Sequence, residues 1–322
     1  MKYLLTNSTD CYYNMAFEEY AFENLDPAES YVSLWRNNNT VVVGRYQNTA
    51  AELNETYASE HNVSVVRRLS GGGAVYHDLG NLNYTFIAES DAGQVKADFA
   101  RFTKPVVEAL STLGVNAELS GRNDLTIDGK KFSGNAQYSK NGRTMHHGTL
   151  MFASDLNVIS EVLKPPGAKF ESKGVKSVRS RVANIGEFTS ATMDDFKAAL
   201  LTSLNAEPLT LTSTQLGEIQ ELRDTKYALR EWNYGKSPPY TMRVEQRFPF
   251  GGIEVRLDVE NDKIQSVSIL GDFFGAPDIS GAENTLIGAA PTIDGISKAL
   301  SRVDISEFIY GLDNEQFINI FR

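Results

Sequence analysis

The 322-residue chain contains a single cysteine, Cys11, so it cannot form an internal disulfide or a thiolate metal cluster. Long apolar runs are also missing, since no stretch approaches the roughly 20 residues that span a bilayer. The N-terminal segment becomes polar too early for the apolar region of a signal peptide. We therefore expect a cytoplasmic protein without a membrane partner.

Basic residues are in the minority, with 31 lysines and arginines against 41 acidic residues and a formal net charge of −10. This balance argues against sequence-independent nucleic-acid binding, which needs a basic surface. The composition is otherwise ordinary for a globular protein, and the length suits one large domain plus a small one. We expect a monomer with no nucleic-acid partner.

Several well-known catalytic motifs are absent from the sequence. It has no GxSxG elbow, no GxxxxGK[ST] loop, no GxGxxG fingerprint and no HExxH. The adjacent pair His146-His147 is a poor metal chelator on a strand, because neighbouring side chains point to opposite faces. We expect His146 to be structural and one of the two histidines to line a pocket. If ATP is used, it is bound without a P-loop.

The most informative segment is RRLSGGGAVYHDLGN, residues 67–81. Glycines allow a ligand to approach the backbone N–H groups, and such a nest of donors favours anions. Arg68 can add a bidentate contact to a phosphate or carboxylate, and His77 can form a hydrogen bond near the loop. A plain turn between two strands is the alternative, which the two arginines make less favourable.

Lys131 is the best catalytic candidate, in the segment GKKFSGNAQ. We expect a hairpin of residues 124–127 and 131–138 across the turn Asp128-Gly129. On a strand Lys130 and Lys131 face opposite ways, so only one can enter a site, where an ammonium would stabilise developing charge. Asp124 could orient phosphates through Mg²⁺. The alternatives are two solvated lysines and an Asx turn at Asp124.

The remaining patterns predict the order of elements. Helices are expected over residues 14–25, 49–60, 99–113, 194–204 and 216–227, and strands over 31–35, 40–44, 63–66, 83–88 and 149–152. Residues 164–181 carry six basic residues against one acid, which predicts a long mobile loop and favours a lid. We place a domain boundary at 244/245, giving a catalytic domain of residues 1–244 and an α+β domain of residues 245–322.

Together these segments resemble the lipoate–protein ligase A type of the biotin/lipoate ligase family. The matching pieces are RRLSGGGAVYHDLGN, GRNDL, GKKFSGNAQ, HHGTLMF, KGVKSVRSRVANI and REWNYGKSP, and they cover most of residues 30–240. The resemblance implies an α+β fold, in which a mixed sheet flanked by helices is related to class II aminoacyl-tRNA synthetases. It also implies a small C-terminal accessory domain.

The resemblance further implies an activity in two steps. Lipoate and Mg-ATP would form lipoyl-AMP and pyrophosphate, and the lipoyl group would pass to a lysine of a lipoyl domain. The acceptors would be the glycine cleavage H protein or acyltransferase subunits of 2-oxoacid dehydrogenases. ATP and Mg²⁺ are thus the expected cofactors, and lipoate the expected substrate.

The resemblance also implies which residues form the site, because each matches a position in the family's motifs. Lys131 is expected to contact both the acyl carbonyl and the phosphate. The expected nucleotide contacts are Arg68, Ser70, Gly71, Gly72, Gly73, Ala74, Val75, Tyr76, His77, Asp124 and Lys131, with Asp124 also the Mg²⁺ ligand. The expected lipoate contacts are Trp35, Arg68, Lys131, Ala136 and His147. The expected lid residues are Lys173, Lys176, Ser177, Arg179 and Asn184.

Three other functions stay open on sequence alone. An octanoyl or lipoyl transferase of the same fold would need a cysteine thioester, for which the chain offers only Cys11. A non-catalytic lipoate- or lipoyl-domain-binding protein would not need Lys131. A biotin ligase would need a glycine- and arginine-rich adenylate loop, which the sequence lacks.

Overall fold

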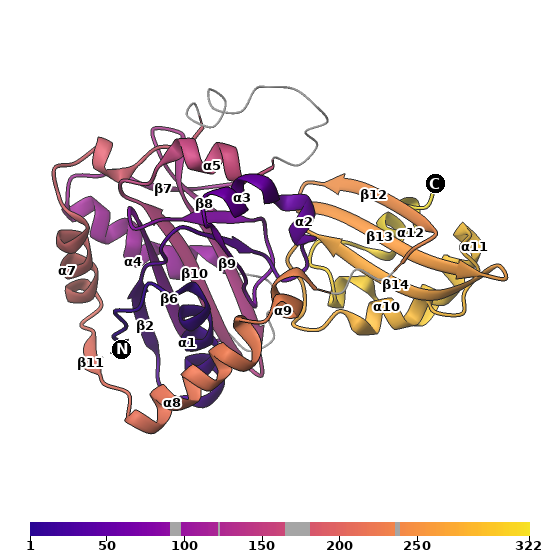
Figure 1. Ribbon diagram of the computed structural model, residues 1–322, viewed down its shortest axis with the longest axis horizontal. Coiled ribbons are helices and arrows are strands. Elements are labelled where there is room, and N and C mark those ends of the chain that lie inside the picture. Colours follow the sequence, from indigo (N-terminus) through magenta and orange to yellow (C-terminus); the bar gives the residue numbers. More distant parts are fainter. Residues whose placement is uncertain (91–97, 122, 165–180, 236–238) are drawn as a thin grey trace.

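The computed structural model describes residues 1–90, 98–121, 123–164, 181–235 and 239–322. The chain forms a large unit built around a broad sheet and a smaller C-terminal unit beside it (Figure 1). This is the mixed α+β architecture with a small accessory domain that the sequence predicts. Among the described residues, no helix combines the length and the apolar character needed to cross a membrane.

The central sheet has eight strands within the described residues, and it is mixed. The strands β11, β1 and β2 run parallel, whereas β2, β6, β10, β9, β8 and β7 alternate in direction. In sheet order they are β11 (Glu207–Leu209), β1 (Lys2–Leu4), β2 (Tyr31–Trp35), β6 (Asn81–Glu89), β10 (Arg143–Met151), β9 (Lys130–Lys140), β8 (Asp124–Ile127) and β7 (Glu118–Ser120).

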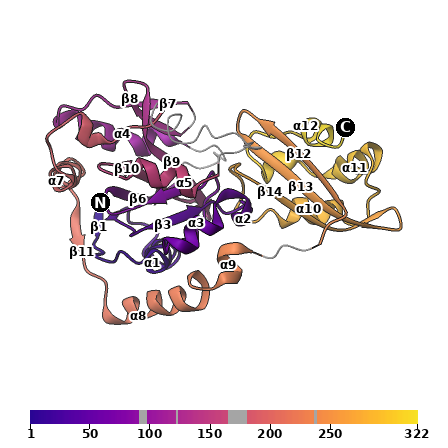
Figure 2. The same cartoon turned by 45° about the horizontal axis from the view of Figure 1, so that its top comes forward.

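Each face of this sheet is covered by a separate apolar core, because side chains alternate along every strand. Val32 and Leu34 of β2 pack with helices α4 (Phe99–Thr112) and α7 (Met193–Ser203). Tyr31 and Trp35 pack on the other face with helix α1 (Cys11–Asn24). Helix α8 (Ser213–Leu222) lies along α1 (Figure 2). The candidate site lies on the α1 face.

A three-stranded sheet borders the same face and carries the glycine loop. Its order is β4 (Ser64–Arg67), β3 (Thr40–Val43) and β5 (Val75–His77). Parallel pairing of β3 with β4 and antiparallel pairing with β5 bring both ends of the glycine loop together. Short elements complete the large unit: α2 (Thr49–Glu52), α3 (Glu55–Glu60), α5 (Leu156–Val162), η1 (Ile185–Glu187), the π-helical turn η2 (Arg223–Tyr227) and α9 (Arg230–Tyr234).

The predicted hairpin forms as expected, for a local reason. Asp128 and Gly129 have φ values of 51° and 74°, which suit a type I′ turn and match the twist of the flanking strands. A register shift near the turn leaves Phe132 as an extra residue, since Thr126 pairs with Lys131 and Leu125 with Ser133. Because of this shift, the Phe132 side chain points into the buried core beside Leu125. The Lys131 side chain stays outside that core and is partly exposed.

Three predicted helices differ from the structure. The helix expected over residues 14–25 begins at Cys11, where Asp10 caps α1. The helix expected over residues 49–60 is divided into α2 and α3, because Leu53 forms a bridge with Leu163 and Asn54 caps the second helix. The helix expected from residue 216 begins three residues earlier, where Thr212 and Gln215 form a capping box. The pattern rules did not predict strands β1, β5, β7 and β11, which have only three residues each.

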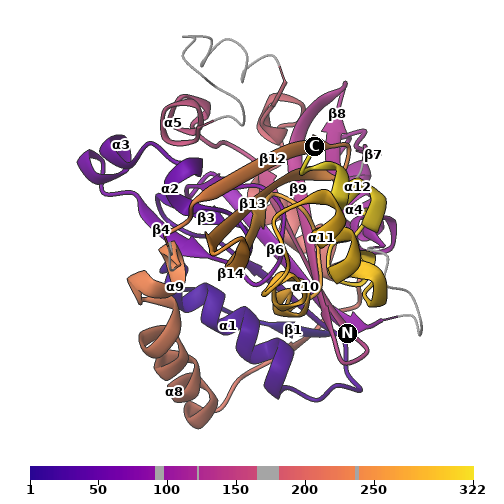
Figure 3. The same cartoon turned by 90° about the vertical axis from the view of Figure 1, so that its right-hand side faces the viewer.

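The small unit has its own core and its own sheet. Strands β12 (Met242–Phe248), β13 (Gly251–Glu260) and β14 (Lys263–Gly271) form an antiparallel meander. Figure 3 shows α10 (Ser280–Leu286), α11 (Ile293–Ala299) and α12 (Asn314–Asn319) grouped on one side of this sheet, with η3 (Leu300–Arg302) and η4 (Ile305–Glu307) between α11 and α12 in sequence. The boundary expected at 244/245 falls inside β12. Because β12 pairs with β13 along its length, we propose that the boundary precedes Met242.

The small unit touches the glycine loop directly. Gly72 N donates to the carbonyl oxygen of Phe273 at 3.2 Å, and Gly271 N donates to Tyr46 O at 2.9 Å. The rings of Tyr46 and Phe273 stack with centroids 4.9 Å apart. A side-chain carbon at Gly71 would lie 2.3 Å from the Phe273 oxygen, so only glycine allows this approach. The two units are thus joined at the loop that the sequence singles out.

Candidate functional site

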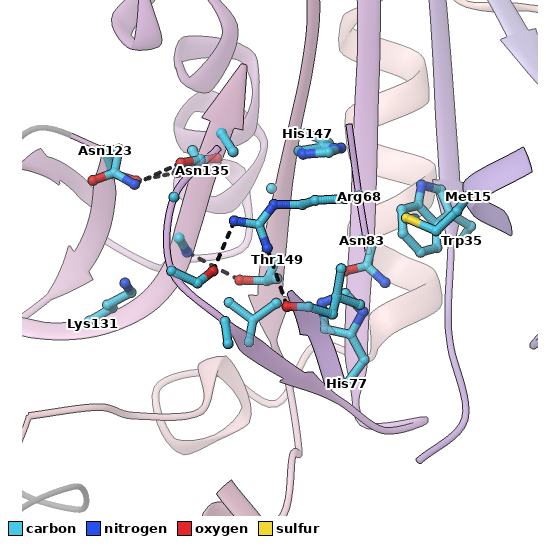
Figure 4. Close-up of a pocket in the computed structure, with 18 residues that line it drawn as sticks. Met15, Trp35, Arg68, His77, Asn83, Asn123, Lys131, Asn135, His147 and Thr149 are labelled. Atoms are coloured by element: carbon cyan, nitrogen blue, oxygen red, sulfur yellow. Dashed lines mark hydrogen bonds between the residues drawn. The ribbon is translucent and has the colours of Figure 1, made fainter. Parts of the chain in front are cut away.

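A cavity opens on the α1 face of the large sheet. Figure 4 shows its lining, with Lys131 and Asn123 at one end and Trp35 and Met15 at the other. The remaining lining residues are Val42, Arg68, Gly72, Gly73, Ala74, Val75, His77, Asn83, Gly134, Asn135, Ala136, His147, Gly148 and Thr149. The cavity therefore has a cationic end and a largely apolar end.

Part of the cavity floor is one row of residues that crosses five strands. Asp124 pairs with Gly134, whose N–H donates to Thr149 Oγ1 at 3.1 Å. Thr149 pairs with Asn83, and Asn83 pairs with Trp35. Directly paired residues share a face of the sheet, so the row runs straight from the Lys131 end to the Trp35 end.

Lys131 stands over the first part of this row. Its ammonium lies 2.7 Å from Asp124 Oδ1, and a side-chain carbon on Gly134 would lie 3.1 Å from its Nζ. The backbone of Lys131 also bonds to the chain after the basic segment, accepting from Ala183 N at 3.0 Å and donating to Arg181 O at 2.8 Å. Because Gly134 has no side chain, the ammonium of Lys131 has room in the cavity.

Arg68 is buried, and its guanidinium braces the glycine loop. Its Nη2 donates to Gly71 O at 2.7 Å and to Gly73 O at 2.8 Å, and its Nε donates to Ser70 Oγ at 3.0 Å. A further bond from Nη1 reaches Val42 O at 3.3 Å. Burial lowers the pKa of Arg68 to about 10, so the side chain remains charged at neutral pH. These bonds shape the loop, and Arg68 also lines the cavity, so its contact with a ligand stays a prediction.

Arg67 was not singled out by the sequence reasoning, although it holds the same region together. Its guanidinium donates to the carbonyl oxygens of Gly44, Gln47 and Asn233 at 2.8–3.0 Å. Asn233 Oδ1 accepts from the Arg67 backbone N–H at 2.9 Å. Asn233 belongs to the segment REWNYG, so this motif fastens helix α9 to strand β4 and has a structural role.

A chain of buried polar side chains links the glycine loop to the opposite wall. Ser70 Oγ lies 2.6 Å from His147 Nε2, and His147 Nδ1 lies 3.1 Å from Glu18 Oε1. Thr85 Oγ1 donates to Glu18 and accepts from Trp35 Nε1 at 2.9 Å. A carboxylate at Glu18 accepts from Nδ1–H and so leaves Nε2 to accept from Ser70.

Glu18 was not among the predicted site residues, because it lies in the predicted helix of residues 14–25 and in none of the motifs. It is among the most buried charged residues, with 3% of its surface exposed. The available signal was its position on α1 among Met15, Phe17 and Phe22, all of which are buried in the core. No local pattern indicated His147 as its partner.

His77 and Asn83 line the cavity, and each also has one hydrogen-bond donor buried beneath its surface. Asn37 Nδ2 lies 3.2 Å from His77 Nδ1, and the Asn37 oxygen already accepts from Asn14, so the His77 proton is on Nε2. Burial lowers the pKa of His77 to about 3, and the ring is neutral. Asn83 Oδ1 accepts from Asn81 Nδ2 at 2.9 Å, which turns its own Nδ2 away. His77 Nε2 and Asn83 Nδ2 are both buried without a partner.

The structure thus brings most of the predicted site residues together. Trp35, Arg68, Gly72, Gly73, Ala74, Val75, His77, Lys131, Ala136 and His147 line the cavity. Ser70 and Gly71 lie behind this lining as partners of His147 and Arg68, and Asp124 lies behind it as the partner of Lys131. Tyr76 instead packs in a separate core with Val41 and Val43 and donates to Asn39 Oδ1 at 3.0 Å. Asn184 stands apart and pairs with Ser154 through bonds of 2.9 and 3.1 Å. Lys173, Lys176, Ser177 and Arg179 lie outside the described residues.

The two histidines of the HH pair divide as expected. His147 lines the cavity, whereas His146 is fully buried on the other face, where it stacks on Phe102 at 5.0 Å and contacts Gln137. Within the described residues, no group of three or more His, Cys, Asp or Glu side chains is placed to hold a metal ion. A metal bound here would need ligands from a substrate.

Comparison with known families matches both units. Residues 10–205 match the lipoyl protein ligase A/B catalytic domain, and residues 237–321 match the bacterial lipoate protein ligase C-terminus. The chain therefore belongs to the lipoate–protein ligase family, a family of enzymes. Lipoate–protein ligase 1 of Staphylococcus aureus is 42% identical over 99% of both chains. A lipoate–protein ligase of Bacillus subtilis is 42% identical over 98% of this chain and 97% of its own.

Solved structures give the same fold. Plasmodium falciparum LipL1, solved in complex with lipoate, has a TM-score of 0.79 at 22% identity and covers 99% of this chain and 97% of its own. A bi-partite ligase of Thermoplasma acidophilum, described with its E2 lipoyl domain, has a TM-score of 0.68 at 30% identity and covers 75% of this chain and 98% of its own. A lipoate–protein ligase A bound with ATP has a TM-score of 0.65 at 28% identity and covers 73% of this chain and 98% of its own.

Proposed function

We propose that this enzyme activates lipoate with ATP to lipoyl-AMP and transfers the lipoyl group to a lysine of a lipoyl-domain protein. The observation that carries the proposal is the position of Lys131, whose ammonium stands in a cavity with an apolar far end. A medium-length acyl chain fits the apolar end, with its carboxylate beside Lys131. Relatives of this chain are named lipoate–protein ligases, and one similar ligase is solved with ATP.

The chemistry assigned to Lys131 is charge stabilisation. In activation, a carboxylate oxygen attacks the α-phosphorus and pyrophosphate leaves, so negative charge builds on the phosphoryl oxygens. In transfer, the acceptor amine attacks the acyl carbonyl and AMP leaves. An ammonium held near the junction of acyl and phosphate can stabilise both transition states. The glycine loop also lines the cavity at Gly73 and Ala74, and the backbone N–H groups of such a loop suit a nucleotide phosphate.

We place Mg²⁺, if it is used, beside Asp124. Mg²⁺ typically takes one or two carboxylates together with substrate phosphates and water, and Asp124 is a partly exposed carboxylate at the cationic end. Because the described residues offer no fuller ligand set, the ion would enter with the triphosphate. The carboxylate of Asp124 would then exchange its contact with Lys131 for one with the ion.

The acceptor is proposed to be a lipoyl domain, such as the glycine cleavage H protein or an acyltransferase subunit of a 2-oxoacid dehydrogenase. The Thermoplasma acidophilum ligase, described with its E2 lipoyl domain, supports this class of partner. We also propose that the reaction takes place in the cytoplasm and that the enzyme acts as a monomer.

The thioester mechanism is disfavoured by the position of Cys11. The thiol is buried at the start of α1 and does not line the cavity. Burial raises its pKa to about 12, whereas an attacking thiol must form a thiolate. A cysteine in this state cannot accept an acyl group from a carrier protein without a large local opening of the fold.

An ATP–pyrophosphate exchange assay with lipoate, octanoate and biotin as alternative acids tests the proposal. We expect exchange with lipoate and none with biotin, followed by lipoylation of an added lipoyl domain. Acyl transfer from a carrier thioester in the absence of ATP would favour the transferase instead. Lipoate binding with neither exchange nor transfer would indicate a binding protein.

A further inference from the structure

A group of buried polar side chains lies on the face of the large sheet that packs on α4, behind the cationic end of the cavity. Tyr84 and His146 are fully buried there, and Asn135, the residue after Gly134, is 3% exposed. Tyr84, Gly148 and Asn135 pair across β6, β10 and β9, so they share this face. Polar groups in a core are costly unless each has its partner, so the partners show what this group holds in place.

Gly148 allows Asn135 to reach Tyr84 across a whole strand. A side-chain carbon at Gly148 would lie 2.2 Å from Asn135 Oδ1 and 2.6 Å from the Tyr84 ring. Because glycine leaves this space open, the hydroxyl of Tyr84 donates to Asn135 Oδ1 over the middle strand. The side chains of two strands that are not neighbours are thereby linked.

The amide of Asn135 is held in one orientation. Gln137 Nε2 donates to Asp98 O at 2.8 Å, and since a carbonyl only accepts, the same amino group faces His146 Nδ1 at 3.0 Å. Burial keeps the pKa of His146 well below its usual value, so the neutral ring carries its proton on Nε2, 3.3 Å from Asn135 Oδ1. With two donors on its oxygen, the amide must direct its nitrogen the other way.

That nitrogen holds the entry of strand β8 beside Lys131. Asn135 Nδ2 and the Asn135 backbone N–H donate to Asn123 O at 3.0 and 2.9 Å, and Asn123 Nδ2 donates back to Asn135 O at 2.7 Å (Figure 4). Asn123 directly precedes Asp124, whose carboxylate lies 2.7 Å from Lys131 Nζ. The bonds of Asn135 therefore fix the backbone from which Asp124 projects.

We propose that Tyr84 and Asn135 are positioning residues for the activation step. They act through Asn123, which sets the place of the Asp124–Lys131 pair. This inference rests on the proposed function, because it assigns the charge-stabilising step to Lys131. Without the Tyr84 hydroxyl, the Asn135 amide keeps a single donor on its oxygen and can turn. The ammonium then loses its fixed place, and a displacement of about 1 Å can lower a rate about 10²-fold.

The test is a double-mutant cycle of Tyr84→Phe and Lys131→Ala, measured by ATP–pyrophosphate exchange with lipoate. Phenylalanine keeps the buried ring and removes only the hydroxyl. We expect Tyr84→Phe to lower kcat by about tenfold in the wild-type background and to have little further effect in Lys131→Ala, because changes that act through one group are not additive. The KM for lipoate should stay unchanged.

Two further variants separate positioning from folding. Asn135→Asp keeps the size of the side chain but replaces the donor to Asn123 O by an oxygen, so it should lower kcat as Tyr84→Phe does. Val106→Ala removes volume from the same buried core and has no part in these hydrogen bonds. It should lower the midpoint of thermal unfolding at least as much as Tyr84→Phe and leave kcat unchanged. All variants are assayed below their unfolding transitions.

A wild-type kcat in Tyr84→Phe would overturn the inference, and so would equal fold losses in the two backgrounds of the cycle. A fall of kcat in Val106→Ala as large as in Tyr84→Phe would also overturn it, because the rate would then follow the stability of the core. Each of these outcomes needs an active wild type. A folded wild type that catalyses no exchange with lipoate would overturn the proposed function as well.

Discussion

At the scale of single residues, the structure brings one of two adjacent lysines to the cavity. Lys131 lines the cavity and pairs with Asp124, whereas Lys130 does not line it. The bulge at Phe132 produces this arrangement, since Phe132 turns into the core directly after Lys131. The β-bulge at Phe132 thus accompanies the placement of Lys131, and not Lys130, in the cavity lining.

Replacing Lys131 by Ala should lower the rate of lipoyl-AMP formation by at least about 10²-fold, the scale of losing one donor to a developing charge. Lys130→Ala is the matched control and should have a far smaller effect. Both variants are measured by pyrophosphate exchange with lipoate. Equal losses in the two variants would show that the pair acts only through general charge.

A second residue-scale prediction concerns His146 and pH. Burial holds the pKa of His146 well below its usual value of 6.5, so the folded protein keeps this ring neutral while the unfolded chain can take up a proton. The resulting stability is complete above pH 6.5 and is lost as the pH falls below it. Between pH 7 and pH 5 the loss from one such histidine is about 2 kcal/mol.

We therefore expect His146→Gln to reduce, by about this amount, the fall in unfolding free energy between pH 7 and pH 5. Urea denaturation at the two pH values measures it. His61→Gln is the control, because His61 is exposed and its replacement should leave the pH dependence as it was. A full pH dependence in His146→Gln would mean that other groups, such as His77, account for the effect.

At the scale of elements, the segment REWNYG acts as a fastening between helix α9 and strand β4. Asn233 donates to Tyr227 O at 2.7 Å and Leu229 O at 3.1 Å, in addition to accepting from Arg67. Asn233→Ala should lower the unfolding free energy by about 2–4 kcal/mol, because it leaves a buried N–H unpaired. Urea denaturation tests this, with Asn284→Ala on the exposed side of α10 as the control. Similar small losses in both would contradict the assignment.

Element type was predictable from the sequence wherever the signal was local. The Asp128-Gly129 turn, the N–H-rich loop and the strand over residues 31–35 follow from turn chemistry and β-branched runs. Three-residue strands such as β5 were not predictable, because their pairing partners lie far away in sequence. The same reason explains why Glu18 and Asn83 escaped notice, since burial and cross-strand neighbours alone give them a role.

At the scale of the whole molecule, the cavity-lining residues within the described part of the chain all come from the first 149 residues. Ending the chain before Met242 should therefore leave binding of preformed lipoyl-AMP and acyl transfer to a lipoyl domain intact. Activation from lipoate and ATP should fall sharply, because the small unit supports the glycine loop through Phe273, and in-line attack demands tight positioning. Both half-reactions are assayed on one folded preparation. Full activation without transfer would show that the small unit docks the acceptor instead.

The contact between the two units also bears on how such proteins can be recombined. Gly72 and Gly271 make it with backbone hydrogen bonds to Phe273 and Tyr46, and a main-chain bond is indifferent to the side chains around it. The joint also needs glycine at several positions, since a side-chain carbon at Gly71 would lie 2.3 Å from Phe273 O and the φ values of Gly72 and Gly271 are +90° and +155°. Small units from relatives that keep these glycines and the stacked pair of Tyr46 and Phe273 should therefore be interchangeable on one catalytic unit, even where the rest of the two sequences has diverged.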